Sequence, residues 1–334
     1  MSHYDLYAIG NALVDSEYDV TDAQLSAMGV EKRHMTLIDA PRRAYLLAQV
    51  QGLHARRTGG GSAGNTVVAM AQFGGKAFYS CRVANDELGA FYRDDLQSHG
   101  VASNLFHTAA PHGQTGICMV MITPDAERSM STFLGATAEL DASCLHPKDI
   151  ERSKVYYMEG YLSASPTGLE AALQGRALAR AAGVPLAATL SDMSMINFCR
   201  AGLDAMVGDG LDYLFCNEEE SQVWCGSQDM GQITAHMARL AKVTCITRGA
   251  KGCVVVQGDQ RIEVPAPSVK ALDTNGAGDM FAGAFLYAVT HGHTVAQAAW
   301  LANQAAARVV AQYGNRLDAS AIAELKAAFT QHLR

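Results

Sequence analysis

The sequence predicts a three-layer α/β protein, in which helices cover both faces of a mostly parallel central sheet and a smaller β sheet lies apart. Three observations indicate this fold class. The chain has 334 residues and 49% hydrophobic content, enough to bury a large core. From about residue 154 onward, short β-rich runs alternate with helical stretches. Before that point, two β-rich runs form a hairpin outside this alternation.

The central sheet is predicted from short apolar runs that are separated by amphipathic segments. These runs lie at residues 6–9, 155–158, 186–189, 213–216 and 243–247. The segments between them, such as residues 168–182 and 232–241, have the spacing of βαβ units. We therefore expect parallel strands with helices on both faces of the sheet.

The smaller sheet is predicted from two β-rich runs, at residues 115–122 and 128–134, that flank the polar turn at residues 123–127. Pro124 within this turn supports a hairpin. We expect the hairpin to pair with earlier segments in a small antiparallel sheet that acts as a lid. The lid would comprise the segments near residues 14–20, 34–39 and 115–135.

The chain shows no repeat or linker that would divide it, so we expect one domain over residues 1–334. Two core helices should follow the last motif, at residues 276–290 and 295–313. Charged residues in the hairpin, such as Asp125 and Arg128, would keep an exposed sheet edge soluble. Monomer and homodimer therefore both remain open.

Composition excludes several classes of partner. The net charge is −7 and no basic run is present, so we expect no nucleic-acid partner. The longest apolar helical stretches are shorter than the ~20 residues that span a bilayer, so we expect no membrane span. Residues 1–7 lack the pattern of an export signal. The eight cysteines form no C-x-x-C pair, which favours reduced, buried thiols in a cytoplasmic protein.

The run Gly276-Ala277-Gly278-Asp279 opens an amphipathic helix directly after a segment of β character. Free backbone N–H groups and the helix dipole attract phosphate at such a position. Asp279 could take the proton from a hydroxyl that attacks the phosphate, and nearby backbone donors should keep it ionised. The alternative is an ordinary glycine turn in which Asp279 is a capping residue.

A second glycine cluster, residues 59–65, matches the dinucleotide pattern G-x-G-x-x-G. That pattern should follow a strand, but residues 51–58 are polar and contain no apolar run, which argues against a dinucleotide site. The glycines would instead let the backbone approach a polyol, with the Asn65 amide donating and accepting. The alternative is a loop ahead of a helix at residues 66–73.

Three further polar clusters follow predicted strands. Asp15 lies just past the first strand and could accept hydrogen bonds from two adjacent hydroxyls, although a turn residue is the simpler interpretation. The acids of Asn217-Glu218-Glu219-Glu220 are either a solvated helix start or ligands of a hydrated Mg²⁺. The turn at residues 247–252 offers hydroxyl and cationic donors where nucleotide phosphates could rest.

In this order, the motifs resemble the ribokinase-like family, also called PfkB carbohydrate kinases. The resemblance covers nearly the whole chain and is most specific at residues 273–279. It implies a ribokinase-like three-layer sandwich with a small β-sheet lid, and an ATP- and Mg²⁺-dependent transfer of the γ-phosphate to a primary hydroxyl. Asn275 stands where the family more commonly has Thr, which would affect the K⁺ site that such enzymes often have beside this loop.

The resemblance also implies a role for each matching residue. Asp279 matches the catalytic base, and Gly276, Ala277 and Gly278 match the anion hole. The substrate hydroxyls would be held by Asp15, Gly60, Gly61 and Asn65. The nucleotide side of the site would comprise Asn217, Thr247, Gly249, Asn303 beside the adenine, and Glu220 for Mg²⁺ through water.

Within the family, residues 10–15 and 308–314 are most similar to bacterial adenosine kinase-like members. The resemblance therefore implies transfer to the 5′-hydroxyl of adenosine, with Tyr161 against the base unless it is a plain core residue. The alternatives are a ribose- or fructose-type sugar kinase and an inosine/guanosine kinase. A non-catalytic nucleoside or sugar sensor is the alternative outside enzymes.

Overall fold

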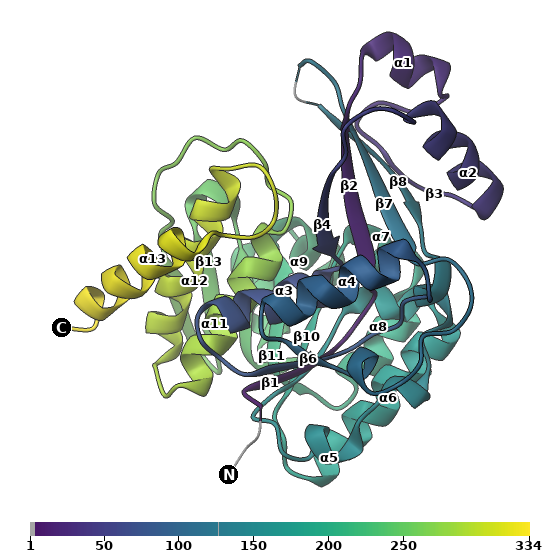
Figure 1. Cartoon of the computed structure of the whole chain (residues 1–334). Helices are drawn as coiled ribbons and strands as arrows, with labels where there is room; N and C mark the ends of the chain where they lie inside the picture. Colours follow the sequence, from purple (N-terminus) through teal and green to yellow (C-terminus); the bar gives the residue numbers. More distant parts are fainter. Residues whose placement is uncertain (1–3, 126) are drawn as a thin grey trace.

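Two β sheets organise the chain in the computed structural model, which describes residues 4–125 and 127–334. The large sheet has nine strands in the order β14-β13-β12-β11-β10-β9-β1-β5-β6, and the small sheet has five in the order β3-β8-β7-β2-β4. Figure 1 shows the small sheet projecting from the body that contains the large one. Residues 1–3, part of the segment that we examined for an export signal, and Ala126, in the predicted turn, lie outside the described residues.

The large sheet is mostly parallel, as the sequence predicts. From β6 to β12 all neighbouring strands are parallel, and only β13 and β14 run antiparallel at one edge. Its strands are β1 (Leu6–Ile9), β5 (Ala77–Ser80), β6 (Ala102–Ser103), β9 (Tyr156–Met158), β10 (Leu186–Thr189), β11 (Leu211–Asn217), β12 (Ala241–Thr247), β13 (Cys253–Gln257) and β14 (Gln260–Val264).

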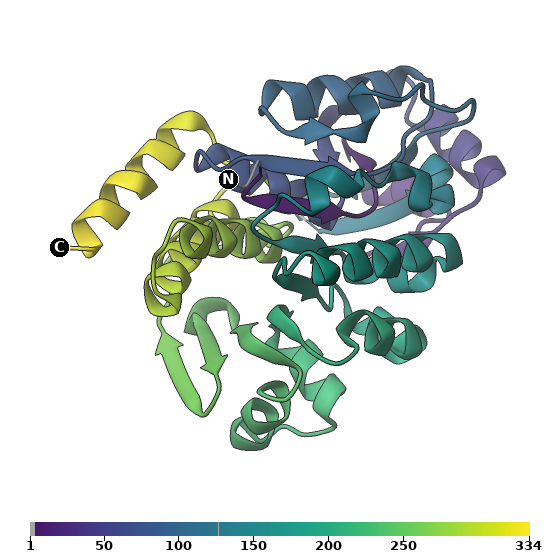
Figure 2. The same cartoon turned by 90° about the horizontal axis from the view of Figure 1, so that it is seen from below.

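Two apolar clusters cover the two faces of this sheet, which confirms the three-layer arrangement (Figure 2). In β1, Leu6 and Ala8 belong to one cluster and Tyr7 and Ile9 to the other, as strand alternation requires. The first cluster includes α3 (Ser62–Gln72), α4 (Glu87–Ser98), α11 (Ala277–Thr290), α12 (Val295–Val310) and α13 (Ala319–His332). The second includes α5 (Pro147–Ile150), α6 (Pro166–Ala181), α7 (Met193–Phe198), α8 (Arg200–Val207), α9 (Glu218–Cys225) and α10 (Met230–Met237).

The small sheet contains the three expected segments, but it is mixed rather than antiparallel. Strand β2 is parallel to β7 and antiparallel to β4, and β3 is parallel to β8. The strands are β2 (Leu13–Asp19), β3 (Met35–Leu37), β4 (Arg56–Gly60), β7 (Gly116–Ile122) and β8 (Arg128–Phe133). Helix α1 (Asp22–Ala27) connects β2 to β3, and helix α2 (Ala40–Gln49) connects β3 to β4. The parallel partners β2 and β7, and β3 and β8, are far apart in the chain, so their connections are long enough for parallel pairing.

The strand β4 contradicts the prediction that no strand precedes the second glycine cluster. Its first residues are charged and exposed, and only Gly59 and Gly60 are buried, so no apolar run marks it. It pairs antiparallel with β2 in the small sheet, so the parallel strand required for dinucleotide binding is still absent. Helix α3 begins directly after it, at Ser62, and Asn65 is therefore helical rather than part of a loop.

Arg128 lies at the start of β8, before the residues Met130–Thr132 that pair with β3, and its charge is used in ion pairs rather than left free on an exposed edge. Strand β8 is flanked by β3 and β7, and the Arg128 guanidinium pairs with Glu17 at 2.8 Å and with Asp273 at 2.9 Å. These contacts connect the small sheet to the loop before α11.

Helix α12 ends at Val310 instead of continuing to Tyr313, which is 58% exposed.

Helices α3 and α11 cross at a glycine. A Cβ atom on Gly283 of α11 would lie 2.5 Å from the Ala69 Cβ and 2.6 Å from the Thr66 carbonyl oxygen of α3. Because both neighbours belong to a helix rather than to a flexible chain end, they cannot move aside without shifting α3.

Among the described residues, no helix is both long and apolar enough to span a membrane.

We predict that Gly283→Ala lowers the free energy of unfolding by about 1–3 kcal/mol, because overpacking forces the two helices apart. The measurement is denaturant unfolding of the variant and the wild type. Gly231→Ala is the matched control, since Gly231 is an exposed helical residue whose added methyl meets only the Asp229 side chain. Equal stability of Gly283→Ala and Gly231→Ala would show that the crossing tolerates a methyl group.

Candidate functional site

Polar residues gather at the carboxyl ends of the parallel strands. Glu159 follows β9, Asp192 follows β10, Asn217 ends β11 and Thr247 ends β12. In open α/β sheets this edge is where ligands bind. The N-termini of α3 and α11 also reach this edge and bring the two glycine-rich motifs together, through the contacts between α3 and Asp279.

Asp279 lies in the first turn of α11 and is held by two side chains of α3. The Ser62 hydroxyl donates to Oδ1 at 2.6 Å, and the Asn65 amide donates to Oδ2 at 2.9 Å. Burial raises the pKa of Asp279 to about 6, while these two hydrogen bonds act to lower it. The donors are therefore side chains of α3, in contrast to the backbone donors that the sequence suggested.

The turn ahead of α11 presents free backbone donors. Gly276 is left-handed, with φ of 73°, which favours glycine. Within the described residues, the N–H groups of Gly278 and Asp279 donate to no backbone carbonyl, whereas that of Ala277 donates to Thr274 at 3.3 Å. A Cβ on Gly278 would meet nothing within 4 Å, so space is open beside these donors. This geometry suits an anion, and we name residues 276–279 the anion-binding turn.

Asp15 faces the second glycine cluster from β2, so it lies within a strand rather than just past one. A Cβ on Gly60 would lie 2.5 Å from the Asp15 Oδ1, and one on Gly61, where φ is 86°, would collide with the Asn11 carbonyl. Burial raises the pKa of Asp15 to about 7, and the charge of Arg316 opposes this shift. The glycines therefore allow the backbone to lie directly against the Asp15 carboxylate.

Glu159 is a buried carboxylate that the sequence analysis missed. It is 1% exposed and accepts hydrogen bonds from the Ala63 N–H at 2.8 Å, the Asn11 N–H at 3.2 Å and the Asn11 amide at 2.9 Å. Burial raises its pKa to about 7. Because Ala63 is in the first turn of α3, Glu159 fixes the helix end that carries Ser62.

Asn217 and Glu220 form a capping box at the start of α9. The two Glu220 carboxylate oxygens accept from the Asn217 N–H at 3.0 Å and the Asn217 amide at 2.7 Å. Burial, together with the charges of Asp192, Glu219 and Asp279, raises the pKa of Glu220 to about 7, while the hydrogen bond from the Asn217 backbone acts to lower it. This gathering of negative charge fits a hydrated cation, although no cluster of three metal-ligating side chains occurs in the part of the chain that is described.

The remaining predicted residues lie around this centre. Thr247 ends β12 and Gly249 begins the short turn after it, with φ of 55°. Asn303 is buried and its amide donates to the Val264 carbonyl at 2.9 Å, so it can affect a nucleotide only through the segment after β14. Tyr161 follows Glu159, and burial together with the charges of nearby carboxylates, Asp279 among them, raises its pKa.

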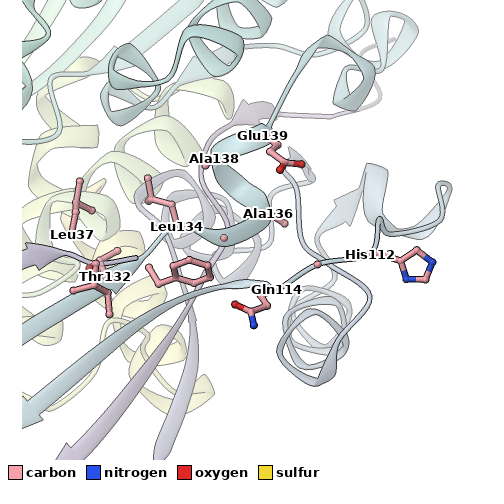
Figure 3. A pocket seen from close by; sticks show the side chains of 12 residues that line it. Leu37, His112, Gln114, Thr132, Leu134, Ala136, Ala138 and Glu139 are labelled. Atoms are coloured by element: carbon pink, nitrogen blue, oxygen red, sulfur yellow. The ribbon is translucent and has the colours of Figure 1, made fainter. Parts of the chain in front are cut away.

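A cavity of about 370 Å³ lies at the base of the small sheet (Figure 3). Leu37, Thr132 and Leu134 line one part of it, and the short helix Gly135–Glu139 lines another. That helix is tied to the site because the Thr137 hydroxyl accepts from the Ala12 N–H at 3.0 Å. The cavity and the residues that precede Asp15 therefore contact the same short helix.

Several residues of this site had no role in the sequence-based prediction. Glu159 and Asp192 could have been found, since each follows a predicted parallel strand as Asn217 does. Ser62 lies inside the quoted glycine cluster. Arg128 and Arg316 carry no local signal, because their partners are distant in the chain.

Comparisons with known proteins agree on the family. Residues 35–322 match the model of the pfkB family carbohydrate kinases. The structure resembles that of adenosine kinase from Sinorhizobium meliloti, with 34% identity, a TM-score of 0.88, and coverage of 97% of this chain and 99% of that one. A probable sugar kinase from Rhizobium etli CFN 42 has 34% identity and a TM-score of 0.88 over 98% and 100% of the chains. Adenosine kinase 1 of Arabidopsis thaliana is 27% identical, over 84% of this chain and 85% of its own length. The chain belongs to the pfkB family of carbohydrate kinases.

Proposed function

We propose that the protein is an ATP-dependent nucleoside kinase that transfers the γ-phosphate to the 5′-hydroxyl of adenosine. As a member of its family it is a phosphotransferase with an alcohol acceptor, and ATP is its cosubstrate. The observation that carries the proposal is the Asp279 carboxylate, which Ser62 and Asn65 hold beside the free N–H groups of an anion-binding turn. A base and a phosphate site thus lie together.

In the proposed mechanism, Asp279 takes the proton of the attacking hydroxyl while the N–H groups of Gly278 and Asp279 stabilise charge on the transferred phosphoryl group. Ser62 and Asn65 orient the carboxylate for this step. Mg²⁺, held through water near Glu220 and Asp192, would neutralise phosphate charge. Closure of the small sheet over the site would exclude water.

Unpaired acceptors support a polyhydroxyl substrate. Among the described residues, the buried Oδ1 atoms of Asn65 and Asn315 have no hydrogen-bond partner. The Asn315 amide lies 3.4 Å from Asp15, and the Asn65 amide contacts Asp279, so one unpaired acceptor lies beside each of the two carboxylates. Buried acceptors without donors are costly, and the hydroxyl groups of a ribose would supply the donors.

The small sheet favours a nucleoside over a free sugar. Its register places Asp15, Cys118, Thr132 and Leu37 in one row across four strands, so these side chains share a face. Leu37 is 61% exposed and Met35, in the next row of the same face, is 47% exposed. A purine that extends from a ribose at Asp15 would cover these apolar side chains, whereas a sugar would leave them in water.

The nucleotide-side roles of Asn217, Thr247, Gly249 and Asn303 are part of the proposal. They rest on the position of the first two at the strand ends and on the resemblance. The K⁺ site remains a prediction. The Asp273 carboxylate beside that loop already accepts from the N–H groups of Asn275 and Gly314, in addition to pairing with Arg128.

The eight free cysteines fit a reducing compartment, and we propose the cytoplasm. The oligomeric state is still only predicted from the sequence, as either a monomer or a homodimer. A non-catalytic sensor would not require a carboxylate that is oriented by two donors beside free N–H groups, which favours the enzyme.

We predict that the wild type phosphorylates adenosine faster than inosine, guanosine, ribose or fructose when ATP and Mg²⁺ are supplied. Asp279→Ala should lower kcat by about 10²–10⁴-fold, because the general base is lost. Initial rates of ADP release over this substrate panel provide the measurement. Asp204→Asn, in an exposed ion pair of α8, should retain wild-type rates. The assignment fails if Asp279→Ala keeps more than a third of the wild-type turnover.

We predict that Ser62→Ala shifts the acid limb of the kcat profile to higher pH. Asp279 acts in its ionised form, so the rate should fall as pH drops through its pKa of about 6. The Ser62 hydrogen bond favours the ionised form, so its removal raises that pKa. The rate must be followed between about pH 5 and 8 with Ser320→Ala, an exposed residue in the first turn of α13, as the control. An unmoved limb, or one at lower pH, would contradict this role of Ser62.

A further inference from the structure

Three consecutive residues after α12 contact several separate parts of the site. The Gly314 N–H donates to the Asp273 carboxylate at 3.1 Å. Asn315 packs beneath the anion-binding turn, where a Cβ on Gly276 would lie 2.5 Å from the Asn315 Cβ. The Asn315 amide also lies 3.4 Å from Asp15 in the small sheet. The backbone of this segment is therefore constrained from both the phosphate side and the substrate side.

Arg316 completes these contacts. Its side chain is only 9% exposed, forms an ion pair with Asp95 of α4, and donates from Nη2 to the Gly59 carbonyl at 2.8 Å. Gly59 lies near the end of β4, directly before the glycines that lead into α3. The next carbonyl, that of Gly60, accepts from the Tyr92 hydroxyl of α4 at 2.8 Å. The junction between the small sheet and α3 is thus held by side chains from α4 and from the segment after α12.

Arg316 also acts on Asp15 through its charge. Burial disfavours the ionised form of Asp15, and Arg316 is the strongest influence in the opposite direction. The charged and titratable groups that face Asp15 are Arg316, Glu17, Asp279, Arg128 and the Cys118 thiol. Loss of Arg316 would leave Arg128 as the remaining cation of this set, and Arg128 already pairs with Glu17 and Asp273.

We propose that Arg316 is a positioning residue that couples the end of β4 at Gly59 to the anion-binding turn, through residues 314–316, and places its positive charge on the Asp15 side of the substrate site. This inference rests on the proposed nucleoside kinase activity for its kinetic part. It explains why a guanidinium is buried here: only a forked donor can reach the Asp95 carboxylate and the Gly59 carbonyl together.

The test compares Arg316→Gln, Arg316→Lys and the control Arg308→Gln, whose wild-type residue pairs with Glu324 away from the site. The first readout is hydrogen exchange of backbone amides in the protein without substrates. In Arg316→Gln, exchange should rise together at residues 59–61 and at Ala277 and Met280, whose N–H groups donate to Thr274 and Gly276 across the turn, and it should remain unchanged in Arg308→Gln. A rise at only one of the two segments, or at neither, would overturn the coupling.

The second readout is the pH dependence of the KM for adenosine. In Arg316→Gln the KM should rise about tenfold near neutral pH, and its increase on acidification should begin at higher pH than in the wild type, because Asp15 loses its main cation. Arg316→Lys keeps the charge without the fork, so it should restore the pH profile but not the slow exchange at residues 59–61. A purely structural role would instead change kcat and the KM values for both substrates without moving the profile.

Asp95→Asn serves if Arg316→Gln does not fold. It removes the ion-pair partner and retains the arginine, so exchange at residues 59–61 should rise while the pH profile stays near that of the wild type. Unchanged exchange in Asp95→Asn would count against the proposal. A wild type that does not phosphorylate adenosine would refute the proposed function. The exchange experiment tests the coupling through Arg316 separately, because it needs no substrate.

Discussion

The close crossing of α3 and α11 is the constraint on which the candidate site depends. Gly283 lets the two helices approach until their N-terminal turns meet at the carboxyl edge of the parallel sheet. One turn carries Ser62 and Asn65 and the other carries Asp279, so the contact between motifs more than 200 residues apart follows from helix packing. Because α3 starts where the small sheet ends and α11 starts within the anion-binding turn, the same crossing also sets the distance between these two parts.

Four carboxylates belong to the candidate site, of which Glu159 and Glu220 are buried and Asp15 and Asp279 are partly buried, and burial raises the pKa of each above its ordinary value. Asp15, Glu159 and Glu220 reach about 7 and Asp279 about 6. Such a gathering of disfavoured charges is typical of functional sites rather than of stable cores. The hydrogen bonds differ in origin: those of Asp279 come from side chains, and those of Glu159 come largely from the backbone. The Asp279 and Glu159 carboxylates are therefore held in position by different kinds of hydrogen-bond donor.

The sequence predicted the parts of the fold that depend on local patterns. Apolar runs separated by amphipathic helices indicated the parallel sheet, and the glycine-rich turn indicated the start of α11. It did not predict β4, whose charged residues gain their strand geometry only by pairing with β2. The ion pairs of Arg128 were not predicted, because Glu17 and Asp273 are distant from it in the chain. Arg316 was missed because Asp95 and Gly59 are adjacent to it only in the folded chain.

The central claim is that the Asp279 carboxylate lies where it can accept the proton of a primary hydroxyl from a nucleoside whose ribose is held at Asp15. The most direct measurement is the position of the transferred phosphate, determined by phosphorus NMR after the wild type has reacted with adenosine, ATP and Mg²⁺. The account predicts a single phosphomonoester on the 5′-carbon of adenosine. Phosphate on a ring hydroxyl, or release of inorganic phosphate without a phosphorylated nucleoside, would contradict it.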